Sequence, residues 1–286
     1  MLIKRNILLF FRDRASVFFS LLGALLILML YVLFLGDMLE AGLRAGLGFD
    51  SPYIRPAMAS IILAGMVAVT SVTSSLGAME IRVADQEGAG RDFLTSPISR
   101  GKLTRSYMLG SAVIGLIMTL LILALSVAYI TAMGGAFPGI TDWALLVVTV
   151  ILCVLCANAM MFFVTAFVKS AAAFASLSAV IGALIGFIMG IYIPIGTLPD
   201  AVQWIVRLFP MSHAASMFRQ ILSDAPLQTL FTGAPPEVLG EFQELYGIVF
   251  HYGDFVSGFW FSTAFLAVTT VMFYALSVVV VRRQRG

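Results

Sequence analysis

Six apolar stretches, each long enough to cross a lipid bilayer as a helix, dominate the sequence. A helix needs about 20 consecutive apolar residues to cross the hydrocarbon core, because its backbone groups must be satisfied within the segment itself. The stretches cover residues 15–35, 54–79, 106–133, 143–168, 171–195 and 255–281. Only 11% of the residues are charged, against about 25% in an ordinary soluble domain. We therefore predict an all-α polytopic membrane protein whose residues 1–286 form one transmembrane domain.

Lys and Arg residues are divided unequally between the two sides of this predicted membrane. If the spans alternate in direction, 13 of the 17 lie on the side of the two termini. The other four are Arg44, Arg55, Arg207 and Arg219. Because cytoplasmic loops carry the excess of Lys and Arg, we expect both termini in the cytoplasm and the chain in the inner or plasma membrane of the cell. Residues 80–105 then form a cytoplasmic loop, and residues 197–254 form an extracytoplasmic segment.

Two charge features limit the partners. The formal charge of only +2 argues against a nucleic-acid binder that works through a large basic face. The segment 197–254 carries more acidic than basic residues. We interpret this acidity as the complement of the basic cytoplasmic side, with screening of a cationic substrate as the alternative.

Residues 1–14 precede the first span and are themselves partly apolar. At 100° per residue, Ile3, Ile7, Phe10 and Phe11 share one side of a helix. The basic residues on the other side are Lys4, Arg5 and Arg12. This pattern predicts an interfacial amphipathic helix that lies flat on the inner leaflet. An extension of the first span into the cytoplasm is the alternative, whereas a signal peptide fits poorly because the span is too long and its leader too apolar.

No catalytic or metal-binding group is predicted. Cys153 and Cys156 form a C-x-x-C within a span, where no cationic neighbour lowers a thiol pKa and no second pair completes a zinc site, so we interpret them as packing residues. His213 and His251 lie in the outer segment without a ligand at helical spacing, and we expect both to be surface or interfacial.

The source of energy is constrained by what the spans lack. None of the six predicted spans carries Asp, Glu, Lys or His in its interior, whereas ion-coupled transporters use such groups to bind the driving ion. The Gly101-Lys102 pair is not a Walker A loop, because Ser96 stands where its first glycine is needed and Leu103 follows the lysine. If the chain moves a solute uphill, we expect hydrolysis in another chain. ATP and Mg would then bind the partner, and this chain would bind no cofactor.

The loop 80–105 has the chemistry of a docking element. A short helix bearing Asp92, Phe93 and Leu94 would be stopped by Pro97, so that the apolar pair could enter a cleft on a partner. Arg91 and Arg100 could pair with acidic residues of that partner. An ordinary solvated charged loop is the alternative interpretation.

This loop resembles the cytoplasmic coupling segment of the ABC type-2 exporter permeases. Their pattern is an acidic residue and glycine, a short leucine-bearing helix, and then Ser/Thr-Pro-hydrophobic-Ser-Arg, which Ser96-Pro97-Ile98-Ser99-Arg100 matches. The chain departs from the pattern at Gly88-Ala89-Gly90 and Arg91-Asp92, where the family more often has a single glycine and a Thr-Leu pair. The candidate coupling residues are Asp85, Glu87, Gly88, Arg91, Asp92, Phe93, Leu94, Pro97, Ser99 and Arg100.

The resemblance extends to the N-terminal helix, the six spans and the segment that begins at Leu198-Pro199, which is similar to the family's short outer helices. It implies two permease subunits, identical or homologous, with two cytoplasmic ATP-binding subunits docked on the coupling segments. The implied function is export of a drug, lipid or peptide. A six-span channel or scaffold without ATP dependence and an integral-membrane lipid enzyme are the alternatives.

Two further groups of residues bear on this assembly. Gly182, Gly186 and Gly190 recur at every fourth position of the fifth span and predict a close helix contact, either at the dimer seam or within the chain. A hydroxyl cluster lies towards the inner end of the second span. Its members are Thr70, Ser71, Thr73, Ser74 and Ser75. These side chains either line the translocation path or bond to backbone carbonyls of their own helix.

Overall fold

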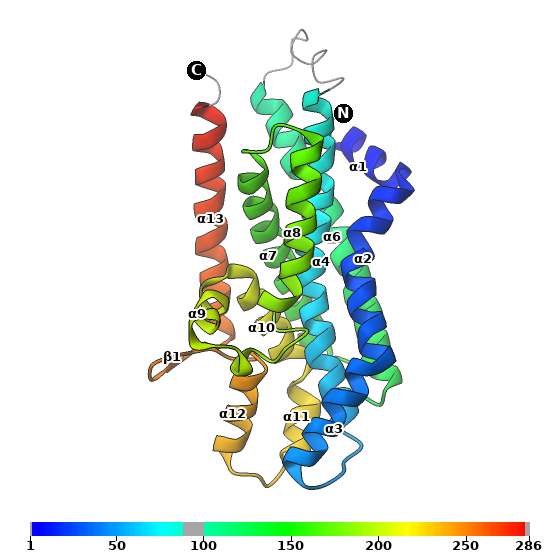
Figure 1. The fold of residues 1–286 in the computed structure, drawn as a ribbon, viewed down its shortest axis with the longest axis vertical. Coiled ribbons are helices and arrows are strands. Elements are labelled where there is room, and N and C mark those ends of the chain that lie inside the picture. The colour runs from blue at the N-terminus through cyan, green and yellow to red at the C-terminus, as the bar shows by residue number, and fades with distance from the viewer. Residues whose placement is uncertain (1, 88–99, 284–286) are drawn as a thin grey trace.

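The fold is a bundle of long helices with a cluster of short elements at one end (Figure 1). The computed structural model describes the backbone of residues 2–87 and 100–283 and the side chains of residues 2–86 and 101–280. Among these residues, six helical segments are long and apolar enough to cross a membrane, which confirms the predicted number. They are α2 to α3 (Arg14–Leu47), α4 (Ile54–Glu87), α6 (Arg100–Ala132), α7 (Ile140–Thr165), α8 (Ala171–Ile188) and α13 (Phe259–Arg283).

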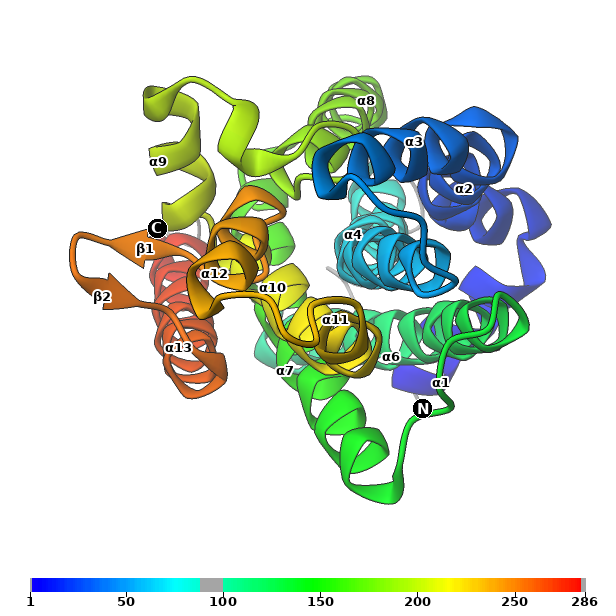
Figure 2. The same cartoon turned by 90° about the horizontal axis from the view of Figure 1, so that it is seen from below.

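Helix α4 forms the centre of the bundle. It contacts α2, α6, α7, α8 and α10, and Figure 2 shows it enclosed by its neighbours when the bundle is viewed along its length. Its residues from Ile54 to Val72 are mostly Ala, Ile, Met and Val, and nearly all are buried. The continuous apolar run of the second span therefore reflects burial on every side within the protein.

The two ends of the bundle differ. Helix α1 (Leu2–Arg12) and the last turn of α13 lie at one end, here called the terminal end, and α3 (Gly36–Leu47), α11 (Asp224–Leu230) and α12 (Pro236–Leu245) lie at the opposite far end (Figure 1). Both described ends of the chain are thus on one side, as an even number of crossings requires.

Helix α1 is a separate element that packs on α6 and α2. Asp13 ends it and caps α2 (Arg14–Leu30), because its carboxylate accepts a hydrogen bond from the backbone N–H of Ala15 at 3.0 Å. Phe10 is buried, whereas Leu8, Leu9 and Phe11 are exposed. Residues 2–12 are thus helical, and their role as an amphipathic helix on the inner leaflet stays a prediction.

The first span is longer than expected. The prediction ended it at residue 35, but the helix continues to Leu47 through a π-helical turn, η1 (Tyr31–Leu35). The carbonyl oxygen of Tyr31 lies 2.8 Å from the place that a Cβ on Gly36 would occupy, so the turn requires glycine there. The extension carries Glu40, which pairs with Arg55 at 3.3 Å and with Arg44 at 3.9 Å.

The fifth span is shorter than expected. Helix α8 ends at Ile188 and not at residue 195, because Gly190 adopts a left-handed conformation with φ 62°. The N–H of Ile191 bonds to the carbonyl of Gly186 at 3.0 Å, which completes a Schellman-type C-cap.

The segment between α8 and α13 folds into short helices and a small hairpin. Its elements are η2 (Ile195–Thr197), α9 (Asp200–Leu208), α10 (Pro210–Leu222), α11, α12, β1 (His251–Tyr252) and β2 (Phe255–Val256). The strands are antiparallel, with His251 opposite Val256. Helix α10 does not stay at the surface: it enters the bundle and packs against α4, α7 and α13, and the chain then returns through α11 to the far end (Figure 1).

Candidate functional site

The predicted coupling loop, residues 80–105, is shorter than expected, because residues 80–87 continue α4 and residues 100–105 begin α6 at the terminal end of the bundle (Figure 1). Glu87 is the last residue of α4 and Arg100 is the first of α6. Seven of the candidate coupling residues lie outside the described residues. They are Gly88, Arg91, Asp92, Phe93, Leu94, Pro97 and Ser99. What the structure describes is therefore the support on which this loop is mounted.

Asp85 is the centre of that support. Its carboxylate accepts two hydrogen bonds from the Arg5 guanidinium, both at 2.8 Å, and one from the Tyr107 hydroxyl at 2.6 Å. The side chain of Asp85 is only 10% exposed. The hydrogen bond to Asp85 raises the pKa of Arg5. We call Arg5, Asp85 and Tyr107 the clasp, because they join α1, α4 and α6.

Asn6 strengthens the same junction. It is buried, and its side-chain amide donates to the carbonyl of Ser106 at 3.2 Å. Gly110 lies opposite, where a Cβ would come within 3.1 Å of the Cβ of Asn6. This small residue therefore lets α1 approach α6 closely. The amphipathic pattern of residues 1–14 does not indicate that Asn6 is buried against α6.

Arg82 connects α4 to the last turn of α7, at the terminal end. Its guanidinium is buried, donates to the Thr165 hydroxyl at 3.3 Å and lies 4.9 Å from the centre of the Phe162 ring. An Arg over an aromatic face gains a cation–π interaction that strengthens when water is excluded. The described ends of α1, α4, α6 and α7 at the terminal end are thus tied by charged or polar contacts.

The glycines of the fifth span occupy three different environments. No heavy atom lies within 4 Å of a Cβ placed on Gly182, whereas Gly186 faces the ring of Tyr192 in the same chain. Gly190 lies beyond the end of α8 and faces Ile195. Gly186 and Gly190 therefore serve packing within the chain in this structure. A role of this stripe at a subunit seam stays a prediction. Of the three glycines, Gly182 has open space beside it.

The hydroxyl cluster of α4 is largely buried. Thr70 donates to the carbonyl of Met66 at 2.8 Å, and Ser74 donates to the carbonyl of Thr70 at 2.6 Å. Ser71 donates to the carbonyl of Ala68 at 2.7 Å and lies 3.0 Å from the sulfur of Cys153. These contacts hide polarity inside the subunit, as the alternative interpretation expected.

The other two hydroxyls differ from these. Thr73 donates to the carbonyl of Ser20 at 2.9 Å and so joins α4 to α2. The Ser75 hydroxyl is buried and has no hydrogen-bond partner in the described part of the chain. Whether the cluster lines a translocation path stays a prediction.

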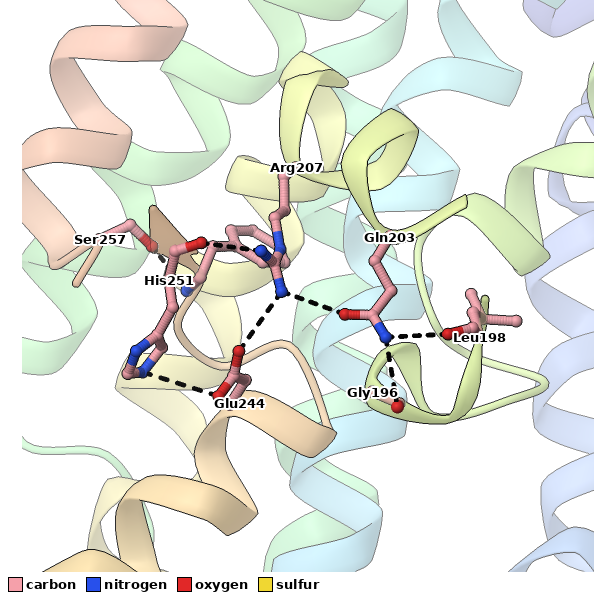
Figure 3. Close-up of polar contacts among 8 residues, drawn as sticks. Gly196, Leu198, Gln203, Arg207, Glu244, His251 and Ser257 are labelled. Atoms are coloured by element: carbon pink, nitrogen blue, oxygen red, sulfur yellow. Dashed lines mark hydrogen bonds and ion pairs between the residues drawn. The ribbon is translucent and has the colours of Figure 1, made fainter. Parts of the chain in front are cut away.

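A polar network at the far end joins segments that the sequence did not connect (Figure 3). Arg207 of α9 donates to the carbonyl of His251 at 2.9 Å, to Gln203 at 3.0 Å and to Glu244 of α12 at 3.3 Å. Gln203 in turn donates to the carbonyls of Leu198 and Gly196 at 2.8 and 3.3 Å. The network fixes α9, α12 and the hairpin relative to one another.

The prediction for His213 was wrong. His213 is buried in α10, with Nδ1 3.1 Å from the Ser262 hydroxyl and Nε2 3.0 Å from the carbonyl of Arg207. Burial lowers the pKa of His213 to about 4. His251 is half-buried, and its Nε2 lies 4.0 Å from a carboxylate oxygen of Glu244. The sequence does not indicate that His213 is buried while His251 is half-buried. This difference depends on where α10 enters the bundle.

The comparison with protein families decides the class of the molecule. Residues 49–279 match the model of the ABC-2 family transporter proteins. The chain belongs to this family. The match covers five of the six spans together with the short elements between α8 and α13, and α1, α2 and α3 precede it. No curated protein matches the chain significantly. The chain is therefore a multi-pass membrane component of a transporter, of a family whose domains are not themselves catalytic.

Proposed function

We propose that this chain is the permease subunit of an ATP-driven exporter and that a separate cytoplasmic subunit binds ATP and Mg. The family match supports a transporter component with an ATP-binding partner. The observation that carries the proposal further is the clasp, in which Asp85 binds Arg5 and Tyr107 at the base of the segment 88–99. A loop that received force from a partner would need such a rigid mount.

The proposed assembly has two permease subunits and two ATP-binding subunits in the cell's inner or plasma membrane. The terminal end faces the cytoplasm, in agreement with its excess of Lys and Arg. Closure of the ATPase dimer would push on residues 88–99, and the clasp would pass this movement to α1, α4 and α6 together. The substrate would be a drug, lipid or peptide, and the second permease subunit would be a copy or a homologue.

Reconstituted inverted vesicles test this function. Purified chain is combined with the ATP-binding subunit that co-purifies with it, and uptake of a fluorescent drug or lipid is measured. We expect uptake with ATP, no uptake with a non-hydrolysable analogue, and persistence with ATP plus a protonophore. Loss of uptake with the protonophore would replace the exporter by a proton-coupled transporter.

The variant Phe93→Ala tests the docking contact in the same vesicles. It should reduce recovery of the ATP-binding subunit and uncouple hydrolysis from uptake, because it removes the ring expected to enter the partner's cleft. Ile140→Ala, at a far-end position that is 91% exposed, is the control. Normal partner recovery and uptake in Phe93→Ala would exclude the docking model.

A further inference from the structure

Arg219 is the largest fully buried side chain among the residues that the structure describes, and it lies within the bundle. Its Nε donates to the carbonyl of Ile61 at 3.2 Å, and Nη1 donates to that of Gly247 at 3.3 Å. Its Nη2 donates to the carbonyls of Met189 and Gly190 at 2.6 and 3.2 Å. Among the residues that the structure describes, no carboxylate lies within salt-bridge distance of this guanidinium.

A buried charge of this kind is costly at membrane depth and is usually functional. Backbone carbonyls compensate it here. Met189 and Gly190 follow the last turn of α8, where the partial negative charge of the helix dipole favours a cation. Glycines make room for the guanidinium: a Cβ on Gly65 would come within 3.1 Å of Nη2, and one on Gly247 within 3.2 Å of Nη1.

The four carbonyls belong to three segments that are separate in the chain. Ile61 is in α4, Met189 and Gly190 directly follow α8, and Gly247 lies in the turn after α12. Arg219 itself is in α10, which fills the bundle between α4, α7 and α13 from the far end. The Arg219 side chain therefore connects α10 to α4, to the end of α8 and to the turn after α12.

We propose that Arg219 is the latch of an outer gate, and that α10 is the plug which this latch holds shut. The proposal rests on the proposed function for its direction, since the far end is then the outer face. Outward opening would separate α10 from the end of α8, which requires Arg219 to release the carbonyls of Met189 and Gly190. The contacts to Ile61 and Gly247 would keep the guanidinium satisfied in part during this movement.

The chain carries its own probes of gate opening. Cys153 and Cys156 are its only cysteines, and both are buried. Cys153 contacts Ser71, which is ten residues further along α4 than Ile61, or about 15 Å towards the terminal end at 1.5 Å per residue. Cys153 therefore lies deeper than the latch for a reagent that enters from the far end.

The experiment measures labelling of these cysteines by a membrane-impermeant maleimide added to right-side-out vesicles without nucleotide. Arg219→Met should label at least tenfold faster than the unmodified protein, whereas Arg219→Lys, which keeps a cation able to bond some carbonyls, should fall between them. Arg44→Met is the matched control, because Arg44 also lies at the far end but its side chain pairs with Glu40 and Asp50, in α3 and the loop after it. It should label at the unmodified rate.

Gly65→Ala tests the latch without removing its charge. The added Cβ would stand 2.8 Å from Ile191 and 3.1 Å from the guanidinium, so it should loosen the contact and raise outer labelling several-fold. This variant decides the question if Arg219→Met does not assemble. Faster labelling from the inner face as well would indicate general unfolding and would count against a latch. Variants that assemble but label at the rate of the unmodified protein would also count against it.

Failure of the exporter proposal gives a different result. The unmodified protein could show no ATP-dependent uptake while Arg219→Met still labels faster from the far-end face. In that case the latch proposal stands, and the proposal that ATP drives transport is wrong. If uptake depends on ATP but labelling does not change, the latch is wrong and the exporter stands.

Discussion

The clasp at the base of the segment 88–99 gives the sharpest prediction, through the variant Arg5→Ala. This change removes two charge-assisted hydrogen bonds of 2.8 Å to Asp85. Hydrogen bonds to charged groups contribute about 1.5–3 kcal/mol each. Because the Arg5 side chain is 32% exposed, water replaces part of this interaction, and we expect a loss of about 2 kcal/mol for the pair.

The expected consequence is local opening of α1, not unfolding of the bundle. A loss of about 2 kcal/mol corresponds to a roughly 30-fold larger open population. Amide hydrogen exchange of residues 2–12 should accelerate by this factor, while α4 and α7 keep their protection. Hydrolysis by the partner should continue, but substrate uptake per ATP should fall, because α1 no longer moves with α4 and α6.

Arg12→Ala is the matched control, since Arg12 ends the same helix and is exposed. Asp85→Asn should resemble Arg5→Ala, because it weakens the same pair from the other side. Exchange in Arg5→Ala that matches the Arg12→Ala control would refute the clasp as the element that fixes α1.

Two further predictions concern other parts of the molecule. Gly182→Leu should leave the subunit folded but lower the recovery of permease dimers on crosslinking, whereas Gly186→Leu should destabilise the subunit itself through contact with Tyr192; equal dimer recovery in Gly182→Leu would move the seam elsewhere. The pKa of His213 is about 4 in the folded state and about 6.5 in the unfolded state. Because the unfolded state binds more protons between these two values, the free energy of unfolding falls as the pH drops from about 6.5 to 4, by up to about 3 kcal/mol. His213→Gln should flatten this dependence in thermal melts of the purified protein, and a melt profile parallel to that of the unmodified chain would show that His213 is not the group responsible.

The spans could be predicted from sequence because hydropathy reports the membrane directly. Their ends could not, since these depend on single backbone features. Gly190 ends α8 seven residues before the expected limit of 195 through its positive φ. The π turn at Tyr31–Leu35 carries the first helix past the point where the apolar run stops.

The site was harder to predict because its partners are far apart in the chain. Asp85 is an acidic residue in the predicted docking loop, yet its carboxylate binds Arg5, which lies 80 positions away in the chain. Helix α10 has a polar sequence that is typical of a surface helix, and Arg219 binds backbone carbonyls, which have no side-chain signature. Only the path of the chain into the bundle shows that His213 and Arg219 are buried.

The π turn also changes the angular phase of the first helix. A π turn holds one residue more than an α turn, so the residues after it are rotated by about 100° relative to an unbroken α-helix. In a regular helix Leu39 would occupy the position of Glu40 opposite Arg55, and Glu40 would occupy that of Ala41, which is exposed. A relative with one residue fewer in this turn is therefore expected to form a plain α-helix and still place its carboxylate opposite the arginine.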